Sequence, residues 1–95
     1  MFAVIRRYRF EAANSAEIDR LIREEFVPLI RKAKGFVRYY WLDEGNGQGT
    51  SFGLFEDKPS ADASIRLAAD FVRERAPKLV TLRPKVMEGP VVAHD

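Results

Sequence analysis

The chain has 95 residues and no cysteine, and its 16 basic and 14 acidic side chains leave a net charge of +2. This length fits one domain over residues 1–95, and so mild a charge excess does not indicate a nucleic-acid-binding tail. The lack of cysteine excludes disulfides, thiolate metal sites and cysteine nucleophiles, and it suits a reducing cytoplasm. The N-terminal pattern is wrong for a signal peptide, and no stretch approaches the roughly 20 apolar residues of a membrane span.

The first third of the chain predicts a strand followed by a helix. Residues 2–10 are rich in β-branched and aromatic side chains, as in a strand. A helix is then expected to start at Asn14, with Glu17 completing a capping box. Apolar residues recur at helical spacing beyond it. Pro28 is expected to kink the last turns of this helix, and Gly35 to end it.

The rest of the chain predicts a hairpin, a second helix and a last strand. Strands are expected over 36–44 and 50–56, joined by a five-residue loop, 45–49. The second helix is expected over 59–75, and an extended segment within 79–92. The order strand, helix, strand, strand, helix, strand predicts an α+β fold, in which a four-stranded antiparallel sheet carries two helices on one face.

The two faces of the hairpin are both rich in aromatic residues. A symmetric loop predicts the pairs Glu44–Thr50, Leu42–Phe52, Tyr40–Leu54 and Arg38–Glu56 on one face, and Trp41–Gly53 and Tyr39–Phe55 on the other. The first face is apolar with one ion pair at its end, and it is expected to pack against the helices. A sheet with one solvated face should alternate apolar and polar residues, and this one does not. The second face is therefore expected to meet a second subunit, a ligand or a nucleic acid.

Three segments, FVPLIRKAKGF, GFVRYYWLDEGNGQGTSFGLFED and SIRLAADFVRE, together resemble the dimeric α+β barrel superfamily. They look closest to small uncharacterised proteins related to the antibiotic biosynthesis monooxygenase domain. The resemblance covers about Ala3 to Val92 and is carried by the helix proline, the Gly-Phe entering strand two and the Phe-Glu-Asp leaving strand three. It implies a ferredoxin-like fold and a homodimeric α+β barrel joined through the helix-free sheet faces, with a small-molecule pocket between sheet and helices. Members include cofactor-independent oxygenases of aromatic polyketides, haem-degrading enzymes, isomerases and many proteins of no known activity.

The candidates for catalysis are Arg7, Tyr8 and Tyr40. Alternation along the first strand puts Arg7 and Arg9 on one face, and Arg6 and Tyr8 on the other. In a functional reading, one arginine reaches an anionic or enolate substrate and a tyrosine supplies a hydrogen bond. In the alternative reading, the arginines lie at a strand edge and extend into solvent or pair with acidic neighbours.

Other residues are assigned to a ligand pocket and to a dimer interface. The expected pocket residues are Tyr40, Phe52, Leu54, Ser64 and Ala68, and the expected interface residues are Tyr39, Trp41 and Phe55. Tyrosine and tryptophan bury a large area and keep one polar group, which suits a flat ligand. The same aromatic residues could instead fill the core and the interface. Ser64 lies on the inward stripe of the second helix, where it could bond to the carbonyl of Ser60.

Metal and cofactor chemistry is not expected. His94 is the only histidine and stands next to last, where it would act as a proton acceptor or be a solvated tail residue. One histidine argues against a histidine-rich metal site or a Ser-His-Asp arrangement. Haem chemistry is disfavoured because neither expected helix contains a histidine. The loop GNGQG leads into a strand and is therefore expected to form a turn and no phosphate site.

Three functions remain open. The first is a cofactor-free, monooxygenase-like enzyme for an aromatic or carbonyl small molecule, in which Arg7 and a tyrosine stabilise developing charge. The second is a non-catalytic dimeric module that binds or senses a small molecule. The third is an RNA-binding domain, because RRMs share this order of elements. The segment GTSFGLF only partly fits RNP1, because Thr50 replaces the key aromatic residue, and nucleic acid is therefore not expected as a partner. A membrane is not expected as a partner either, because no stretch approaches the length of an apolar span.

Overall fold

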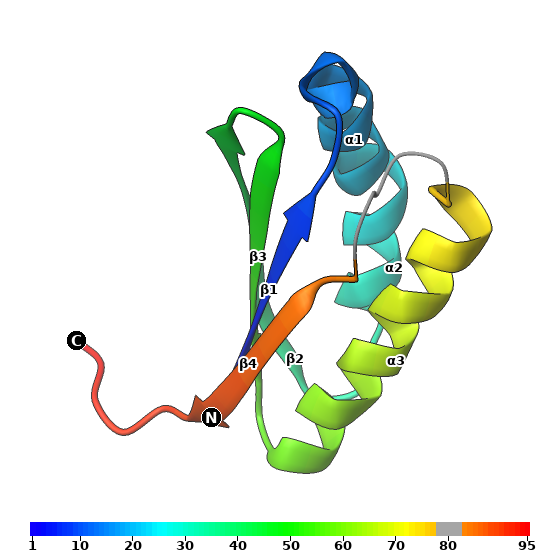
Figure 1. Ribbon diagram of the computed structural model, residues 1–95. Helices are drawn as coiled ribbons and strands as arrows, with labels where there is room; N and C mark the ends of the chain where they lie inside the picture. Colours follow the sequence, from blue (N-terminus) through cyan, green and yellow to red (C-terminus); the bar gives the residue numbers. More distant parts are fainter. Residues whose placement is uncertain (78–82) are drawn as a thin grey trace.

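The computed structural model describes residues 1–77 and 83–95 and packs helices against one face of an antiparallel sheet (Figure 1). The elements in chain order are β1 (Phe2–Arg9), η1 (Ala12–Asn14), α1 (Ser15–Leu21), η2 (Ile22–Phe26), α2 (Val27–Arg31), β2 (Phe36–Gly45), β3 (Gln48–Phe55), α3 (Lys58–Arg75) and β4 (Lys85–Pro90). The strands are ordered β2-β3-β1-β4, and all neighbours are antiparallel. This confirms the ferredoxin-like α+β fold. Of the last expected segment, residues 79–82 lie outside the described residues, and β4 occupies its later part.

The segments α1, η2 and α2 form one helix that contains a π-helical turn. Pro28 has no amide hydrogen to bond the carbonyl of Glu24. In the turn before it, the amide of Val27 bonds to the carbonyl of Ile22, five residues back. The extra residue in this turn lets the helix continue past Pro28. The distortion that was expected at the proline therefore takes the form of a π turn. The predicted capping box is wrong, because Asn14 has φ −93° and ψ 1°, far from the extended backbone of an N-cap, and its side chain makes no capping bond.

The hairpin between β2 and β3 closes through two residues and not through five. Asn46 and Gly47 form the turn with φ of 54° and 76°, the positive values that favour an Asn-Gly hairpin turn. The shorter turn moves the pairing by two residues, so Tyr40 lies opposite Phe52 and not opposite Leu54. The predicted register is therefore wrong. The expected Arg38–Glu56 pairing fails with it, because Arg38 lies opposite Leu54.

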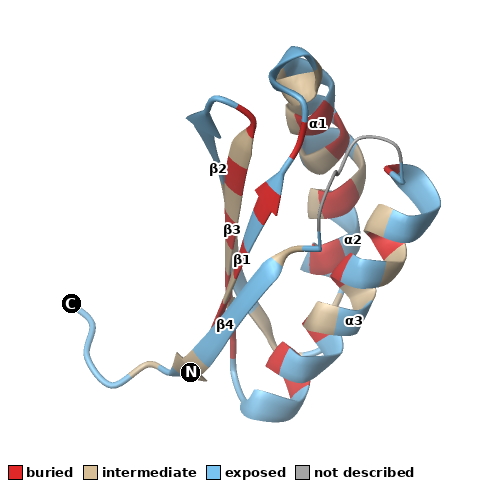
Figure 2. Ribbon diagram, in the orientation of Figure 1, coloured by how far each residue is buried: buried red, intermediate tan, exposed pale blue. Residues whose placement is uncertain are grey.

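The helices cover the face of the sheet opposite to the expected one. Tyr39 and Trp41 point toward the helices: the Tyr39 ring lies 5.3 Å from that of Phe26, and the indole nitrogen of Trp41 donates to Asp19 Oδ1 at 2.8 Å. The main core cluster between the layers consists of Val4, Phe26, Ile30, Phe55, Ala61, Ala68 and Phe71. Figure 2 shows the buried residues between sheet and helices, whereas β4 is exposed along most of its length. The predicted assignment of faces was wrong because aromatic residues occupy both.

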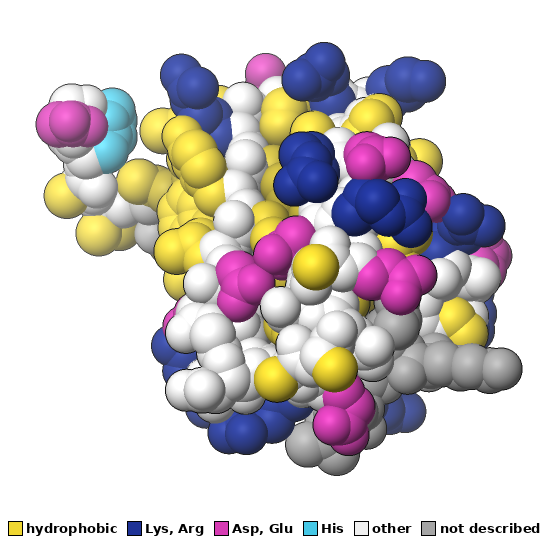
Figure 3. Space-filling view, turned by 90° about the horizontal axis from the view of Figure 1, so that it is seen from above, with side chains coloured by type: hydrophobic (Ala, Val, Ile, Leu, Met, Phe, Trp, Pro, Cys, Tyr) yellow, Lys and Arg dark blue, Asp and Glu magenta, His cyan; other side chains and the backbone are white. Residues whose placement is uncertain are grey.

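The helix-free side of the sheet, here called the open face, carries a row of apolar side chains: Ile5, Tyr40, Leu42, Phe52, Leu54 and Met87. Tyr40 is 52% exposed and Leu42 51%. The rings of Tyr40 and Phe52 lie 6.4 Å apart. Figure 3 shows hydrophobic side chains gathered on the side of the sheet away from the helices. An apolar surface of this kind marks an interaction site.

Candidate functional site

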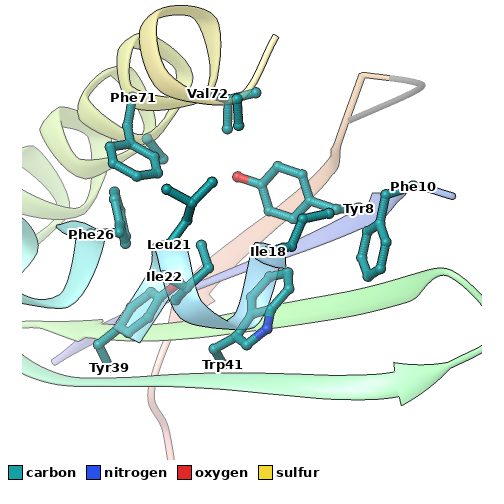
Figure 4. A pocket seen from close by; sticks show the side chains of 12 residues that line it. Tyr8, Phe10, Ile18, Leu21, Ile22, Phe26, Tyr39, Trp41, Phe71 and Val72 are labelled. Atoms are coloured by element: carbon teal, nitrogen blue, oxygen red, sulfur yellow. The ribbon is translucent and has the colours of Figure 1, made fainter. Parts of the chain in front are cut away.

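A small cavity lies between the helices and the sheet, and it is called here the helix–sheet cavity (Figure 4). Its volume is about 30 Å³. Its lining is Tyr8, Phe10, Ile18, Leu21, Ile22, Phe26, Tyr39, Trp41, Ala68, Phe71, Val72 and Ala76. The volume matches one water molecule, whereas pockets for small organic ligands hold roughly 300 Å³ or more. A ligand must therefore displace some of these side chains.

Aromatic side chains make up half of the residues that line this cavity. The ring of Tyr8 lies 5.8 Å from that of Trp41, and the rings of Phe26 and Phe71 lie 5.1 Å apart. All these contacts are tilted, a favourable arrangement for aromatic pairs. Such walls can hold a flat aromatic molecule once the side chains between them move.

A hydrogen bond and a neighbouring glycine determine the position of Trp41. Its N–H bonds to Asp19 on α1, and the space for its ring exists because Gly49 has no side chain: a Cβ there would collide with the indole. Burial raises the pKa of Asp19, and the neighbouring carboxyl of Asp43 acts in the same direction. The glycine that makes room for the tryptophan is thus Gly49, and not Gly53, the residue that was expected opposite Trp41.

A group of polar side chains lies on the helix-covered face beside the cavity. Arg6 is 2% exposed, between Val4 and Tyr8 on β1, and it pairs across the sheet with Ser51. Within residues 1–77 and 83–95, Arg6 Nε, Arg6 Nη1 and Ser51 Oγ have no hydrogen-bond partner. Burial raises the pKa of both Tyr8 and Tyr39, and the nearby charge of Arg6 opposes this rise in each case. Both phenols therefore stay protonated at neutral pH, and Arg6, Tyr8, Tyr39 and Ser51 together form a donor cluster.

The structure brings only some of the expected pocket residues to the cavity. Tyr8 and Ala68 line it, and Ser64 is buried nearby on α3. Ser64 donates to the carbonyl of Ala61 at 2.6 Å and not to that of Ser60. The other three expected pocket residues are Tyr40, Phe52 and Leu54, and they point to the open face. The prediction that they lie beneath the helices is therefore wrong.

The residues expected at the dimer interface lie beneath the helices and not on the open face. Tyr39 and Trp41 line the cavity, and Phe55 is 1% exposed within the core. The catalytic candidate Arg7 is exposed on the open face, across the sheet from the cavity. Sequence reasoning missed Arg6, although its signal was present, because alternation already placed this charged residue on one face with Tyr8. His94 is exposed in the C-terminal segment, which extends away from the sheet (Figure 1).

Two further kinds of site are not found in the part of the chain that the structure describes. No group of three or more histidine, aspartate or glutamate side chains there is arranged to hold a metal ion. No helix within the same residues is both long enough and apolar enough to cross a membrane. The helix–sheet cavity with its donor cluster is thus the candidate site.

Comparison with known proteins places the fold in one structural class. No family model matches the chain, and no curated protein matches it. Among solved structures, a protein of unknown function from Nitrosomonas europaea aligns with a TM-score of 0.84 at 19% identity, over 99% of this chain and 91% of the other. A haem-degrading protein from Mycobacterium tuberculosis, solved with two haems in its active site, aligns at 0.78 and 16% identity, over 100% and 99%.

A third neighbour is a monooxygenase from Streptomyces coelicolor in complex with nanaomycin D, with a TM-score of 0.73 and 13% identity over 98% and 92% of the two chains. At these identities the likeness concerns the fold. The chain therefore has the ferredoxin-like fold of the antibiotic biosynthesis monooxygenase-like proteins. This confirms the ferredoxin-like fold that the sequence resemblance implied.

Replacing Gly49 with alanine is expected to push the indole out of its site and break the bond to Asp19. The free energy of unfolding should fall by about 2 kcal/mol, as in other overpacked cores, and can be measured by urea titration. Because Trp41 is the only tryptophan, its fluorescence reports the displacement directly. Gly89→Ala is the matched control, since a Cβ on Gly89 meets nothing within 4 Å. Equal effects of the two substitutions would contradict the role assigned to Gly49.

Alkaline pH is expected to destabilise the protein through Tyr8 and Tyr39. Their pKa values are raised in the folded chain above the ordinary 10.0, so the unfolded chain loses its protons first. The stability that these phenols contribute is thus complete below pH 10 and is lost as the pH rises beyond it. The added slope should approach about 1.4 kcal/mol per pH unit for each tyrosine.

The measurement is the denaturation midpoint between pH 8 and pH 11. The double variant Tyr8→Phe, Tyr39→Phe should show a shallower loss than the wild type. Tyr40→Phe, on the open face, serves as the control and should follow the wild type. A double variant with the wild-type slope would show that the two buried phenols do not titrate as described.

Proposed function

We propose that this chain is a homodimeric protein related to the antibiotic biosynthesis monooxygenases, which binds a small aromatic or carbonyl compound and oxygenates it without a cofactor. The observation that carries the proposal is the aromatic-walled helix–sheet cavity with buried donors beside it. In this proposal residues 1–95 act as one domain. A cytoplasmic location is proposed with it, because a chain without cysteine suits a reducing compartment.

The cavity would serve as the substrate pocket after local opening. Leu21 and Ile22 lie where α1 passes into η2, and both line the cavity. Turns with π geometry are irregular and occur frequently at functional sites. A shift of this turn away from the sheet would enlarge the cavity without breaking the pairing of the strands.

The chemistry would be a reaction between molecular oxygen and the ionised substrate. The donor cluster would stabilise a phenolate or enolate, which then has enough electron density to react with oxygen directly. A hydroxyanthrone illustrates the balance: its methylene carbon loses two hydrogens and gains one oxygen atom as a carbonyl, and the second oxygen atom leaves as water. The electrons come from the substrate, so neither metal nor flavin is required. A protein with this fold from Streptomyces coelicolor is described as a monooxygenase, which supports an oxygenation reaction for this chain.

Haem degradation is not proposed, although one structural neighbour carries out that reaction. The only histidine of this chain is His94, and it is exposed in the C-terminal segment and does not line the cavity. The polar groups beside the cavity are hydroxyls and a guanidinium, which are donors. They fit an anionic organic ligand better than an iron centre.

A non-catalytic binding or regulatory module is the second candidate. The observation that favours it is that the described residues lining the cavity include no carboxylate and no imidazole to take a proton from a substrate. In that case the same cavity would hold its ligand unchanged. The two candidates share the pocket and differ only in whether oxygen is consumed.

Oxygen uptake with 1,8-dihydroxyanthrone separates the two candidates. An enzyme should accelerate uptake at least about tenfold over buffer, in the presence of a metal chelator, because general catalysis of this kind exceeds that factor. Ala68→Phe, which fills the cavity, should abolish the effect, whereas Ala63→Phe on the exposed side of α3 should leave it. Binding without uptake would support the module, and neither binding nor uptake would contradict the proposed pocket for this class of compound.

The homodimer is proposed to form through the open face. A second copy packed there would cover Tyr40 and Leu42, which a monomer leaves half-exposed. Light scattering at low micromolar concentration should give twice the mass of the chain. Leu42→Glu should give a monomer, since it places a charge in the middle of the apolar row. Leu29→Glu is the matched control, because Leu29 is also an exposed leucine but lies on α2. A monomeric wild type would leave the open face for another partner.

A further inference from the structure

Arg6 is a buried positive charge that forms no ion pair with any residue in the described part of the chain. The side chain is 2% exposed, and an arginine keeps its charge in proteins. None of the ion pairs within residues 1–77 and 83–95 includes it. Residues 78–82 are Lys-Leu-Val-Thr-Leu, so no acidic residue can come from there. Burying a charge without a partner is strongly unfavourable, and such a group is retained where it has a function.

The neighbours of Arg6 are also donors. Ser51 lies opposite it on β3, and its hydroxyl makes no hydrogen bond of good geometry among the described residues, although the Tyr39 hydroxyl lies near enough to interact with it. The hydroxyls of Tyr8 and Tyr39 interact with Arg6 through its charge and through side-chain hydrogen bonds, whereas Arg6 Nε and Nη1 stay unpaired among the described residues, and Figure 4 shows both hydroxyls pointing toward the middle of the cavity. Tyr8 and Tyr39 line the cavity, and Arg6 and Ser51 lie next to it on the sheet, in the same cross-strand row as the lining residue Trp41. The missing component of this arrangement is an acceptor with negative charge.

We infer that the donor cluster recognises the anionic group of the ligand, and that the ligand is a planar aromatic molecule bearing one ionised oxygen group. Its rings would occupy the helix–sheet cavity, and its oxyanion would accept hydrogen bonds from Arg6 and Ser51. This inference rests on the proposed function and names the class of compound that the same pocket takes. In this inference Arg6 selects the ligand by its negative charge, whereas the sequence pointed to Arg7 as the arginine that contacts the charged substrate.

A second copy of the chain cannot provide the missing negative charge through the open face. Arg6 and Arg7 are adjacent on β1 and point to opposite faces of the sheet. A partner on the open face would reach Arg7, whereas Arg6 lies beneath the helices together with Val4 and Tyr8. The counter-ion must therefore enter between the sheet and the helices, which is where the cavity lies.

Calorimetric titration with two matched compounds, 2-naphthoate and 2-naphthamide, tests the inference at pH 7. The two have the same ring system and nearly the same shape, and they differ in charge. Wild-type protein should bind the anion at least about tenfold more tightly, as expected for a hydrogen bond to a charged group. Arg6→Met should reduce that ratio to about one and leave the affinity for the amide within about twofold.

Two further variants make the result specific. Arg7→Met makes the same chemical change on the open face and should keep the wild-type preference for the anion. Ser51→Ala should weaken the preference several-fold without changing any charge. The midpoint of thermal unfolding should rise in Arg6→Met, because the variant removes an unpaired buried charge. A lower midpoint in Arg6→Met together with an unchanged preference for the anion in Ser51→Ala would show that the guanidinium has a structural partner in the protein and would overturn the inference.

The remaining outcomes separate this inference from the proposed function. Equal binding of the two compounds by wild-type protein would overturn the role of Arg6 and leave the pocket in place. No binding of either compound would contradict the pocket itself, and with it both proposals. Should Arg6→Met fail to fold, the wild-type ratio and the Ser51→Ala variant still decide the question.

Discussion

The covering of one sheet face by the helices is the constraint on which the rest of this structure depends. Side chains alternate along each strand, so this single choice separates Arg6 from Arg7 and Tyr39 from Tyr40. The covered face receives the aromatic walls and the donor cluster. The open face receives an apolar row that a monomer leaves in water. A pocket on one side of the sheet and an association surface on the other are two consequences of the same packing.

The close approach of the two layers sets the properties of the cavity. Ala61, Ser64 and Ala68 line the inner side of α3, and their small side chains let the helix lie near the sheet. The space that remains is only about 30 Å³. A ligand would have to separate the layers locally, and the π turn before Pro28 is the irregular part of the covering helix. Buried Arg6 adds an unfavourable term to the folded state that a bound anion would offset.

The fold itself leaves the chemistry open. A protein described as a monooxygenase and another described as a haem degrader share it with this chain at identities of 13% and 16%. Such folds host different reactions because the side chains in the site, and not the arrangement of the strands, contact the substrate. In this chain the site residues are phenols, a serine and an arginine. They are suited to hold an organic anion in an apolar pocket.

The sequence by itself determined the order of the elements, the fold class and the position of the hairpin. These follow from local patterns: alternation in the strands, helical spacing, and glycine at Gly35, where φ is +75°. It also determined which residues share a face, since Arg6 and Tyr8 were grouped correctly. The Asn46-Gly47 pair carried the information for the register, and reading it as part of a five-residue loop caused the error of two residues.

Only the tertiary structure decided which face the helices cover. Both faces hold large aromatic side chains, so the pattern of period two is nearly symmetric and gives no preference. The choice depends on how the helices fit each face: Gly49 leaves space for Trp41, and Phe26 packs against Tyr39 on the covered side. These contacts join residues far apart in the chain. The sequence contained the members of the candidate site, and packing between the layers placed Arg6 on the covered face beside the cavity and left Arg7 on the open face.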